Sequence, residues 1–176
     1  MSFCVLVVPE DPTYNGYILK PLVSRMLQEC GKQNARVTIL TNPRAHGYQH
    51  AKRLIREQLI RRYRHQDLIL FLPDADGEDK IPQLTALEQD ADNEGVSLLC
   101  CAAEQEVEAW LLAGHTDKLA DTWSLIRKDE SLKERVFVPF LKEHGNLRRP
   151  GQGRDLLMIE TLRNYKKLMK QCPELA

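Results

Sequence analysis

The feature that most constrains this chain is a run of five apolar residues, Leu68 to Leu72, followed at once by Pro73-Asp74-Ala75-Asp76-Gly77. The unbroken apolar run predicts a buried strand of a parallel sheet, and the Pro-Asp-x-Asp-Gly sequence predicts the turn that ends it. Two carboxylates then lie at the carboxyl end of a strand, where open α/β sheets bind ligands and where Mg²⁺ or Mn²⁺ finds suitable oxygen donors. Asp and Gly are also ordinary turn residues, so the pair alone does not decide between a site and a turn.

Strand and helix patterns alternate four times along the first two thirds of the chain. Strands are predicted over 3–8, 36–40, 68–72 and 96–101, and helices over 14–30, 46–64, 81–88 and 103–113. This alternation is typical of an α/β fold with a doubly wound, mostly parallel, four-stranded sheet. Beyond residue 114 the pattern is helical, over 118–126, 132–142 and 156–169. We therefore expect an α/β domain over 1–114 and a helical extension over 115–176, packed on it as one compact unit.

Composition favours a cytoplasmic protein with no membrane partner. No stretch approaches the roughly 20 apolar residues that span a bilayer, and the first residues lack the basic and apolar regions of a secretion signal. The five cysteines are odd in number and form no Cys-x-x-Cys pair, which favours reduced thiols over disulfides or a zinc site. His46 and His50 have the spacing of a helical zinc pair, but no third ligand is evident.

Charge is distributed unevenly although the net charge is zero. Residues 74–108 carry eleven acids against one lysine (net −10), whereas 51–66 and 142–170 each carry a net +5 (six bases against one acid, and eight against three). An acidic middle between basic flanks fits a metal centre bordered by phosphate-contacting surface, and charge runs are also commonly solvated helix faces. The candidate nucleic-acid contacts are Arg53, Arg56, Arg148, Arg149, Arg154 and Lys166.

Acidic residues follow three of the four predicted strands. If the first and third strands are neighbours, Glu10 and Asp11 lie at the same sheet edge as the Asp74–Asp76 pair. The fourth strand leads into Glu104 and Glu108, which are four residues apart and are expected on one helix face. Carboxylates this close together do not all stay ionised unless cations neutralise them. The predicted metal ligands are therefore Glu10, Asp11, Asp74, Asp76, Glu104 and Glu108, in an arrangement suited to phosphodiester chemistry.

In order and spacing these motifs resemble a Toprim domain, particularly the small Toprim-like proteins found beside ATPases of the overcoming-lysogenisation-defect type. The resemblance covers roughly residues 3–113 and rests on Glu10, on Asp74-x-Asp76 and on the Glu108-x-Trp110-Leu-Leu sequence. It implies that Glu10, Asp74 and Asp76 are catalytic: Glu10 acts as general acid-base or metal ligand, and the aspartates hold Mg²⁺. A Toprim Glu is usually followed by Gly, whereas Asp11-Pro12 follow here.

Three functions are compatible with these residues. The first is metal-dependent cleavage of DNA or RNA, as the resemblance implies, in defence against phages or mobile elements. The second is a non-catalytic Toprim-like subunit that docks on an ATPase, which Pro9-Glu10-Asp11-Pro12 and the neutral net charge favour. The third, a receiver-like phosphoacceptor, ranks last because Cys100-Cys101 replace the hydroxyl residue expected after the fourth strand. Whether the chain forms a homodimer is left open.

Overall fold

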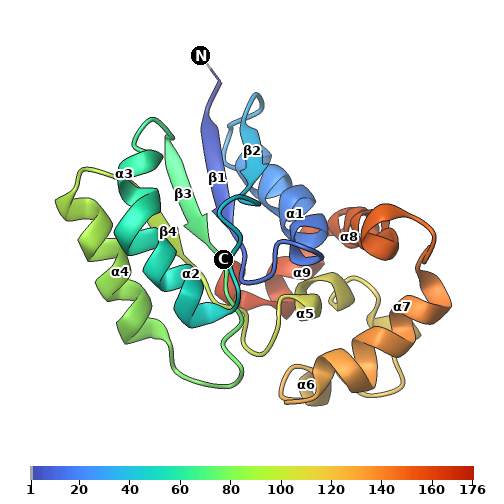
Figure 1. The fold of residues 1–176 in the computed structure, drawn as a ribbon. Coiled ribbons are helices and arrows are strands. Elements are labelled where there is room, and N and C mark those ends of the chain that lie inside the picture. The colour runs from blue at the N-terminus through green and yellow to red at the C-terminus, as the bar shows by residue number, and fades with distance from the viewer. Residues whose placement is uncertain (1) are drawn as a thin grey trace.

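A four-stranded parallel sheet forms the centre of the computed structural model, which describes residues 2–176 (Figure 1). Its strands are β1 (Cys4–Val8), β2 (Arg36–Ile39), β3 (Leu68–Phe71) and β4 (Leu98–Cys100). They are arranged in the order β2-β1-β3-β4, with every neighbouring pair parallel. This confirms the predicted α/β class and the four-stranded parallel sheet, and it makes β1 and β3 the two central strands.

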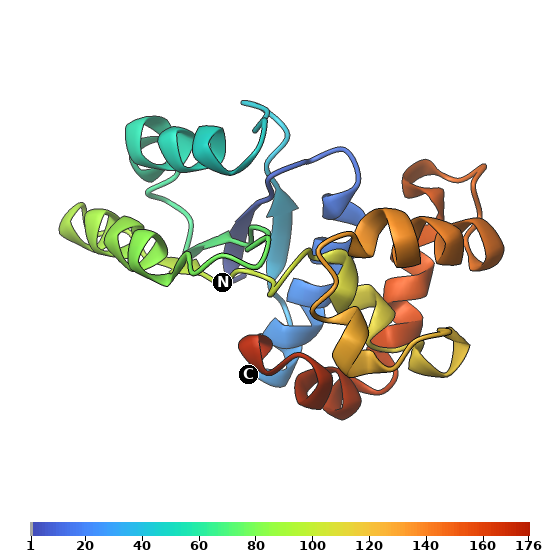
Figure 2. The same cartoon turned by 90° about the horizontal axis from the view of Figure 1, so that it is seen from below.

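Helices cover both faces of the sheet, as Figure 2 shows from below. One face carries α2 (Tyr48–Leu54), its continuation through a π-helical turn (Ile55–Leu59) into α3 (Ile60–Arg62), and α4 (Ile81–Asn93). The other face carries α1 (Asn15–Glu29), α5 (Glu108–Leu112), α8 (Arg154–Leu162) and α9 (Tyr165–Gln171). Side chains alternate along a strand, so Leu6 and Val8 join the core under α2 to α4, while Val5 and Val7 join the core under α1.

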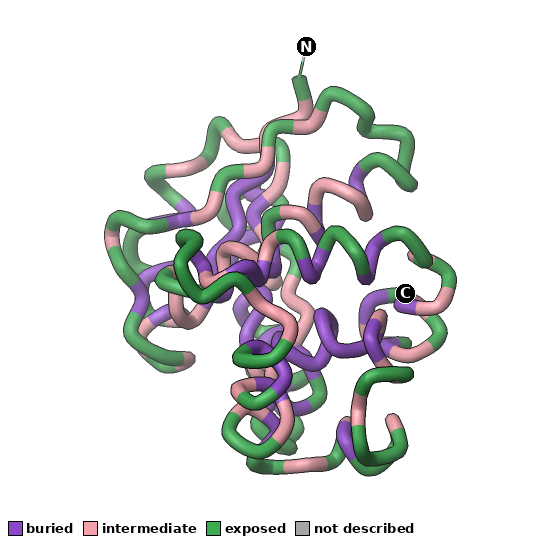
Figure 3. Tube along the Cα trace, turned by 90° about the vertical axis from the view of Figure 1, so that its right-hand side faces the viewer, coloured by how far each residue is buried: buried purple, intermediate pink, exposed green. Residues whose placement is uncertain are grey.

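The chain beyond α5 is built from short helical pieces. These are α6 (Trp123–Ile126), a π-helical turn (Lys133–Phe137) leading into α7 (Val138–His144), α8 and α9, with 3₁₀ turns at Thr116–Lys118, Pro150–Gly153 and Pro173–Leu175. Phe137, Met158 and Leu168 from this segment share one hydrophobic core with Val5 of β1. Buried residues therefore run continuously between the sheet and the helical extension (Figure 3). Within residues 2–176, no helix is long and apolar enough to cross a lipid bilayer.

Four helix predictions were wrong in their limits. The helix expected over 81–88 continues to Asn93. The helix expected over 103–113 begins only at Glu108, because Ala103 to Gln105 continue beside the turn after β3: Ala75 donates to the Ala103 carbonyl (2.9 Å) and Asp76 to the Gln105 carbonyl (3.0 Å). The helix expected over 156–169 is divided, since the Asn164 side chain caps the start of α9 by accepting from the Lys167 amide (3.1 Å). Most of the helix expected over 118–126 is irregular, and only α6 is helical there.

The close contact between α5 and α8 generates a prediction about stability. A methyl group added at Gly114 would overlap Oγ1 and Cα of Thr161, whose hydroxyl donates to the Leu111 carbonyl (2.6 Å). We expect Gly114→Ala to lower the free energy of unfolding by about 1–3 kcal/mol, the usual cost of overpacking. Chemical denaturation measures it, with Gly16→Ala as control because the nearest atom to the added methyl is a side-chain methyl of Ile39 at 3.1 Å, farther away than the Thr161 atoms are from a methyl at Gly114. Equal stability of the two variants would contradict the prediction.

Candidate functional site

The carboxyl edge of the sheet brings Glu10 and Asp74 together. β1 and β3 are parallel neighbours with Val8 opposite Phe71, so the loops that follow them leave the sheet at the same edge. There, Oε1 of Glu10 accepts the backbone N–H of Asp74 at 3.2 Å. Burial raises the pKa of Glu10 to about 6, against the lowering effect of the Lys80 charge. The expectation that these two strand ends meet is confirmed.

Asp74 joins the third segment to this edge. Its Oδ1 accepts the backbone N–H of Val107 at 2.7 Å, directly before α5 begins at Glu108. Burial, followed by the negative charges of Glu108 and Glu10, raises the pKa of Asp74 to about 8. The hydrogen bond from Val107 acts in the opposite direction but does not outweigh them. Asp74 is therefore the residue that links all three strand-end segments.

Glu108 and Glu106 complete what we call the acidic cluster: Glu10, Asp74, Glu106 and Glu108. Glu108 is fully buried, and among the described residues no donor makes a hydrogen bond to either of its carboxylate oxygens. Burial and the neighbouring Glu108 charge raise the pKa of Glu106 to about 7, and its Oε2 also lacks a donor there. Glu106 was missed by sequence reasoning, because a helix placed from 103 hides its position just before the true helix start.

Two lysines border the acidic cluster, and neither was predicted. Lys80 is buried, and its Nζ donates to the Asp74 carbonyl (2.7 Å) and to Oδ2 of Asp76 (3.0 Å) while lying 4.3 Å from the centre of the Tyr48 ring. Lys133, from the helical extension, places its Nζ 3.4 Å from Oε1 of Glu108. The sequence offered one reason to expect Lys80 at this site, because it is the single base within residues 74–108.

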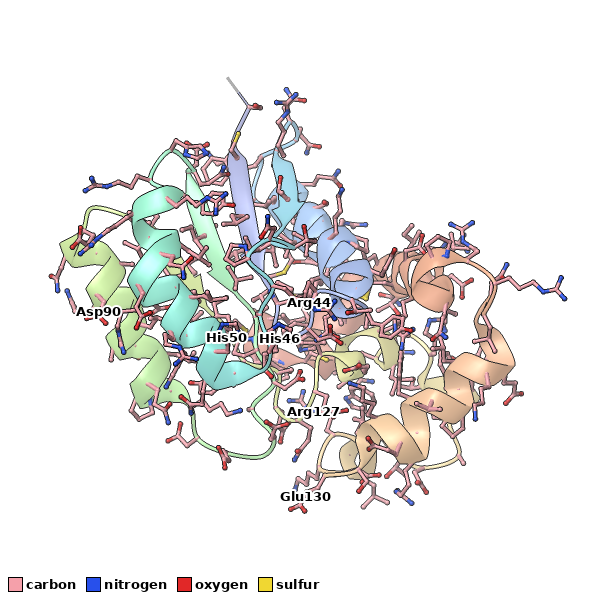
Figure 4. The ribbon with its side chains drawn as sticks, in the orientation of Figure 1. Arg44, His46, His50, Asp90, Arg127 and Glu130 are labelled. Carbon is pink, nitrogen blue, oxygen red and sulfur yellow. The ribbon has the colours of Figure 1, made fainter. Side chains whose placement is uncertain are left out.

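Two predicted ligands, Asp11 and Glu104, belong to other contacts, so their placement in the cluster was wrong. Oδ1 of Asp11 accepts the Thr13 amide at 2.8 Å and lies 3.6 Å from Arg44. Glu104 pairs with Arg127, which also holds Glu174 at 2.9 Å. Figure 4 shows Arg44 beside the carboxyl ends of the strands and Arg127 below them, next to α6. Because α5 starts at Glu108, Glu104 and Glu108 share no helix face.

The basic candidates fall into two groups. Arg154 is buried, with its guanidinium 4.2 Å from the centre of the Tyr14 ring and donating to the Gly151 carbonyl (3.2 Å), so its assignment as a nucleic-acid contact was wrong. The remaining candidates are exposed: Arg53, Arg56, Arg148, Arg149 and Lys166. Among these, Arg56 is paired with Asp90 at 2.6 Å and Arg149 with Asp155 at 3.3 Å.

His46 and His50 contact each other rather than the acidic cluster. Their rings stack with centroids 5.5 Å apart, and Nδ1 of His50 accepts the His46 amide at 3.1 Å (Figure 4). This hydrogen bond occupies one ring nitrogen of the pair. The two histidines therefore have a local structural role at the start of α2.

The acidic cluster offers the donor chemistry of a hard cation. Within residues 2–176 no three His, Cys, Asp or Glu side chains form a ready-made metal-binding group. The carboxylate oxygens of Glu106 and Glu108 that lack a hydrogen bond nevertheless have the chemistry of Mg²⁺ ligands. Burial, together with neighbouring negative charges, raises the pKa values of Glu10, Asp74 and Glu106, and a bound cation would oppose this effect. The predicted ligand Asp76 is exposed and pairs with Lys80 at 3.0 Å, so its carboxylate is already engaged by an ammonium group.

The fold and the site together define a parallel α/β protein with a partly buried acidic cluster at the carboxyl edge of its central strands. Comparison of the chain with protein-family models, with curated proteins and with solved structures gives no match. Functional inference for this chain therefore starts from the residues of the acidic cluster and from the sequence motifs that supply them.

The raised pKa values predict an unusual dependence of stability on pH. Asp74 binds its proton more tightly in the folded state (pKa about 8, against 3.8 ordinarily), so its contribution is complete at low pH and is lost as pH rises through 8. We expect the free energy of unfolding to fall by more than about 1.4 kcal/mol, the equivalent of one pKa unit, between pH 5 and pH 8 without divalent cations. Urea unfolding across this range measures it.

The matched variants are Asp74→Asn, which keeps the acceptor for the Val107 amide, and Glu130→Gln at an exposed position. Asp74→Asn should flatten the decline and raise stability at pH 8, whereas Glu130→Gln should leave the profile unchanged. Stability that rises from pH 5 to pH 8, or equal slopes in all three proteins, would contradict the prediction. Either result would mean that the surroundings of Asp74 do not raise its pKa.

Proposed function

We propose that this chain is a Mg²⁺-dependent phosphodiester hydrolase of Toprim type that acts on nucleic acid. The observation that carries the proposal is the meeting of three strand-end segments at Asp74, whose amide bonds to Glu10 and whose carboxylate bonds to the amide before Glu108. Ligands of open α/β sheets bind at this edge. The same three segments carry the sequence motifs that resemble a Toprim domain.

The residues of the acidic cluster have separable roles in this proposal. A divalent cation held by Asp74, Glu106 and Glu108 would supply Lewis-acid stabilisation of charge on the phosphoryl oxygens. The Glu10 carboxyl, with a pKa of about 6, can gain or lose a proton near neutral pH, as a general acid-base requires. Lys133, which is partly exposed beside Glu108, can contact a phosphate oxygen through its ammonium group.

Exposed basic side chains supply candidate contacts for the nucleic-acid backbone. Arg53, Arg148 and Lys166 are exposed, and within the described chain no ion pair engages them. Contacts of this kind hold phosphate without reading sequence, so they do not distinguish DNA from RNA. A cytoplasmic location and a role in defence against phages or mobile elements complete the proposal.

A second candidate function is a non-catalytic, Toprim-like subunit of an ATPase. One observation favours it: lysines already lie at the acidic edge, with Lys80 on Asp74 and Asp76 and Lys133 on Glu108. In such a protein the lysines would permanently supply the positive charge that a cation supplies in an enzyme. Nucleic-acid cleavage and metal binding separate the two candidates.

A cleavage assay tests the first candidate. We expect the purified protein to cleave plasmid DNA, single-stranded DNA or RNA with Mg²⁺ or Mn²⁺ and to stop when the ion is chelated. Asp74→Asn and Glu10→Gln should lower the rate at least about 100-fold, since each removes a group needed in the reaction. Asp117→Asn, an exposed aspartate outside the acidic cluster, is the matched control and should keep the wild-type rate.

Calorimetry with Mn²⁺ on the same proteins completes the comparison. Cleavage at an unchanged rate by Asp74→Asn would remove the nuclease proposal. If the wild-type protein shows neither cleavage nor ion binding that depends on Asp74, the ATPase-subunit function is favoured instead.

A further inference from the structure

The outer edge of β4 is open. β4 is the last strand in the sheet order, and its inner backbone groups bond to the β3 side: Cys101 donates to the Phe71 carbonyl (3.0 Å) and the Ser97 carbonyl accepts from Ile69 (2.9 Å). Because successive residues of a strand point opposite ways, Leu98, Cys100 and Ala102 direct their backbone N–H and C=O groups outward. An edge of this kind is a template for pairing with another strand.

A trough follows this edge. A cavity of about 640 Å³ lies between α4, the strand and the C-terminal Glu174, and a second of about 660 Å³ continues along β4. Thr85 and Glu88 line both cavities, so the two are neighbours along the same edge, and we call them together the β4 trough. It is a different surface from the acidic cluster, although Lys80 lines one end of it.

The β4 trough is strongly acidic. Five carboxylates line the first cavity and three line the second, and Glu88 belongs to both, which makes seven in all. Glu104 and Glu174 are paired with Arg127. Among the described residues, five of the seven therefore have no basic partner: Asp67, Glu78, Asp79, Glu88 and Asp92. The only base among the lining residues is Lys80, whose ammonium is already bonded to Asp74 and Asp76. In a chain with zero net charge, this concentration of one sign selects a positively charged occupant.

The two sides of the trough differ in chemistry, and this difference predicts the sequence pattern of a segment that would bind there. Leu98 and Cys100 face the core under α4, whereas Leu99 points to the opposite face and is 56% exposed. A strand added beside β4 would therefore turn alternate side chains toward Glu88 and Asp92 of α4 and toward Leu99. Basic residues suit the first side and apolar residues the second.

Glu88 shows that this edge needs a hydrogen-bond acceptor. The outward N–H of Cys100 donates to Oε1 of Glu88 at 2.6 Å, so a side-chain carboxylate stands where the carbonyl of a neighbouring strand would lie. A docked strand would take over this hydrogen bond with its own backbone. The released Glu88 carboxylate could then pair with a basic side chain of the incoming segment.

We propose that the β4 trough binds an extended basic segment of another protein, which adds as a strand to β4 and alternates Lys or Arg with apolar residues. A second copy of this chain does not fit, because pairing β4 with β4 would set the acids of the two troughs against each other. The chain's own basic runs lie mostly within α2–α3 and α7–α9, and Arg148 and Arg149 occupy the short connection after α7. None of these segments is an extended strand. Backbone pairing provides affinity and the alternation provides selectivity. This inference does not rest on the proposed function.

A binding assay with defined peptides tests the proposal. The probe is a capped, fluorescent peptide of about six residues, the usual length of a strand, in which Lys alternates with Val. We expect saturable binding by fluorescence anisotropy and slower hydrogen exchange at the Leu98 and Ala102 amides. Combining Glu88→Gln with Asp92→Asn should weaken binding at least about tenfold, and Gln still accepts the Cys100 amide.

Controls separate strand addition from general charge attraction. Combining Glu57→Gln with Glu130→Gln removes two exposed acids outside the trough and should leave binding unchanged. The same peptide with alternate backbone nitrogens methylated keeps its charge and should bind at least about tenfold more weakly. Absence of binding would overturn the proposal. The acids would then serve only to keep other strands from pairing with the open edge of β4. Equal binding of the methylated peptide, or equal weakening by the control variant, would also overturn the proposal.

Discussion

The acidic edge depends on one constraint, the parallel pairing of β1 with β3. With Val8 opposite Phe71, the two strands end together, and the next residues of both loops are within hydrogen-bonding distance. Burial on both faces fixes this register, since a slip by one residue would exchange the sets of side chains that fill the two cores. The meeting of Glu10 with Asp74 is therefore a consequence of packing at the centre of the sheet.

The acidic cluster carries a cost in folding stability. Glu108 begins a fully buried helix and has no hydrogen-bond donor among the described residues, and a buried charged group without a partner is costly. Lys133 offsets part of this cost from 3.4 Å. Unfavourable burial of this kind is expected at functional sites, where well-packed neighbouring side chains hold groups that would be more stable in water. Here Trp110 and Leu111, both fully buried, provide that frame directly after Glu108.

Much of the fold could be predicted because its signals are local. The apolar run at Leu68–Leu72 and the alternation of elements were sufficient for the parallel sheet. The meeting of Glu10 with Asp74 was predicted only on the condition that the first and third strands are neighbours, and the structure supplies that condition. Residues 103–105 were predicted as helix but extend beside the β3 turn, because pairing with that turn outweighs local preference. The approach of Lys133 and the burial of Arg154 under Tyr14 arise from contacts between segments far apart in sequence, which no local pattern reports.

Lys80 has a consequence that follows from its position between two surfaces. It is a wall residue of the hollow beside β4, and the same ammonium group holds the carbonyl of Asp74 and the carboxylate of Asp76. Its ring contact with Tyr48 ties it to α2 as well. One buried side chain therefore belongs both to the outer flank of the sheet and to its carboxyl edge, so a substitution of Lys80 would alter the two surfaces together.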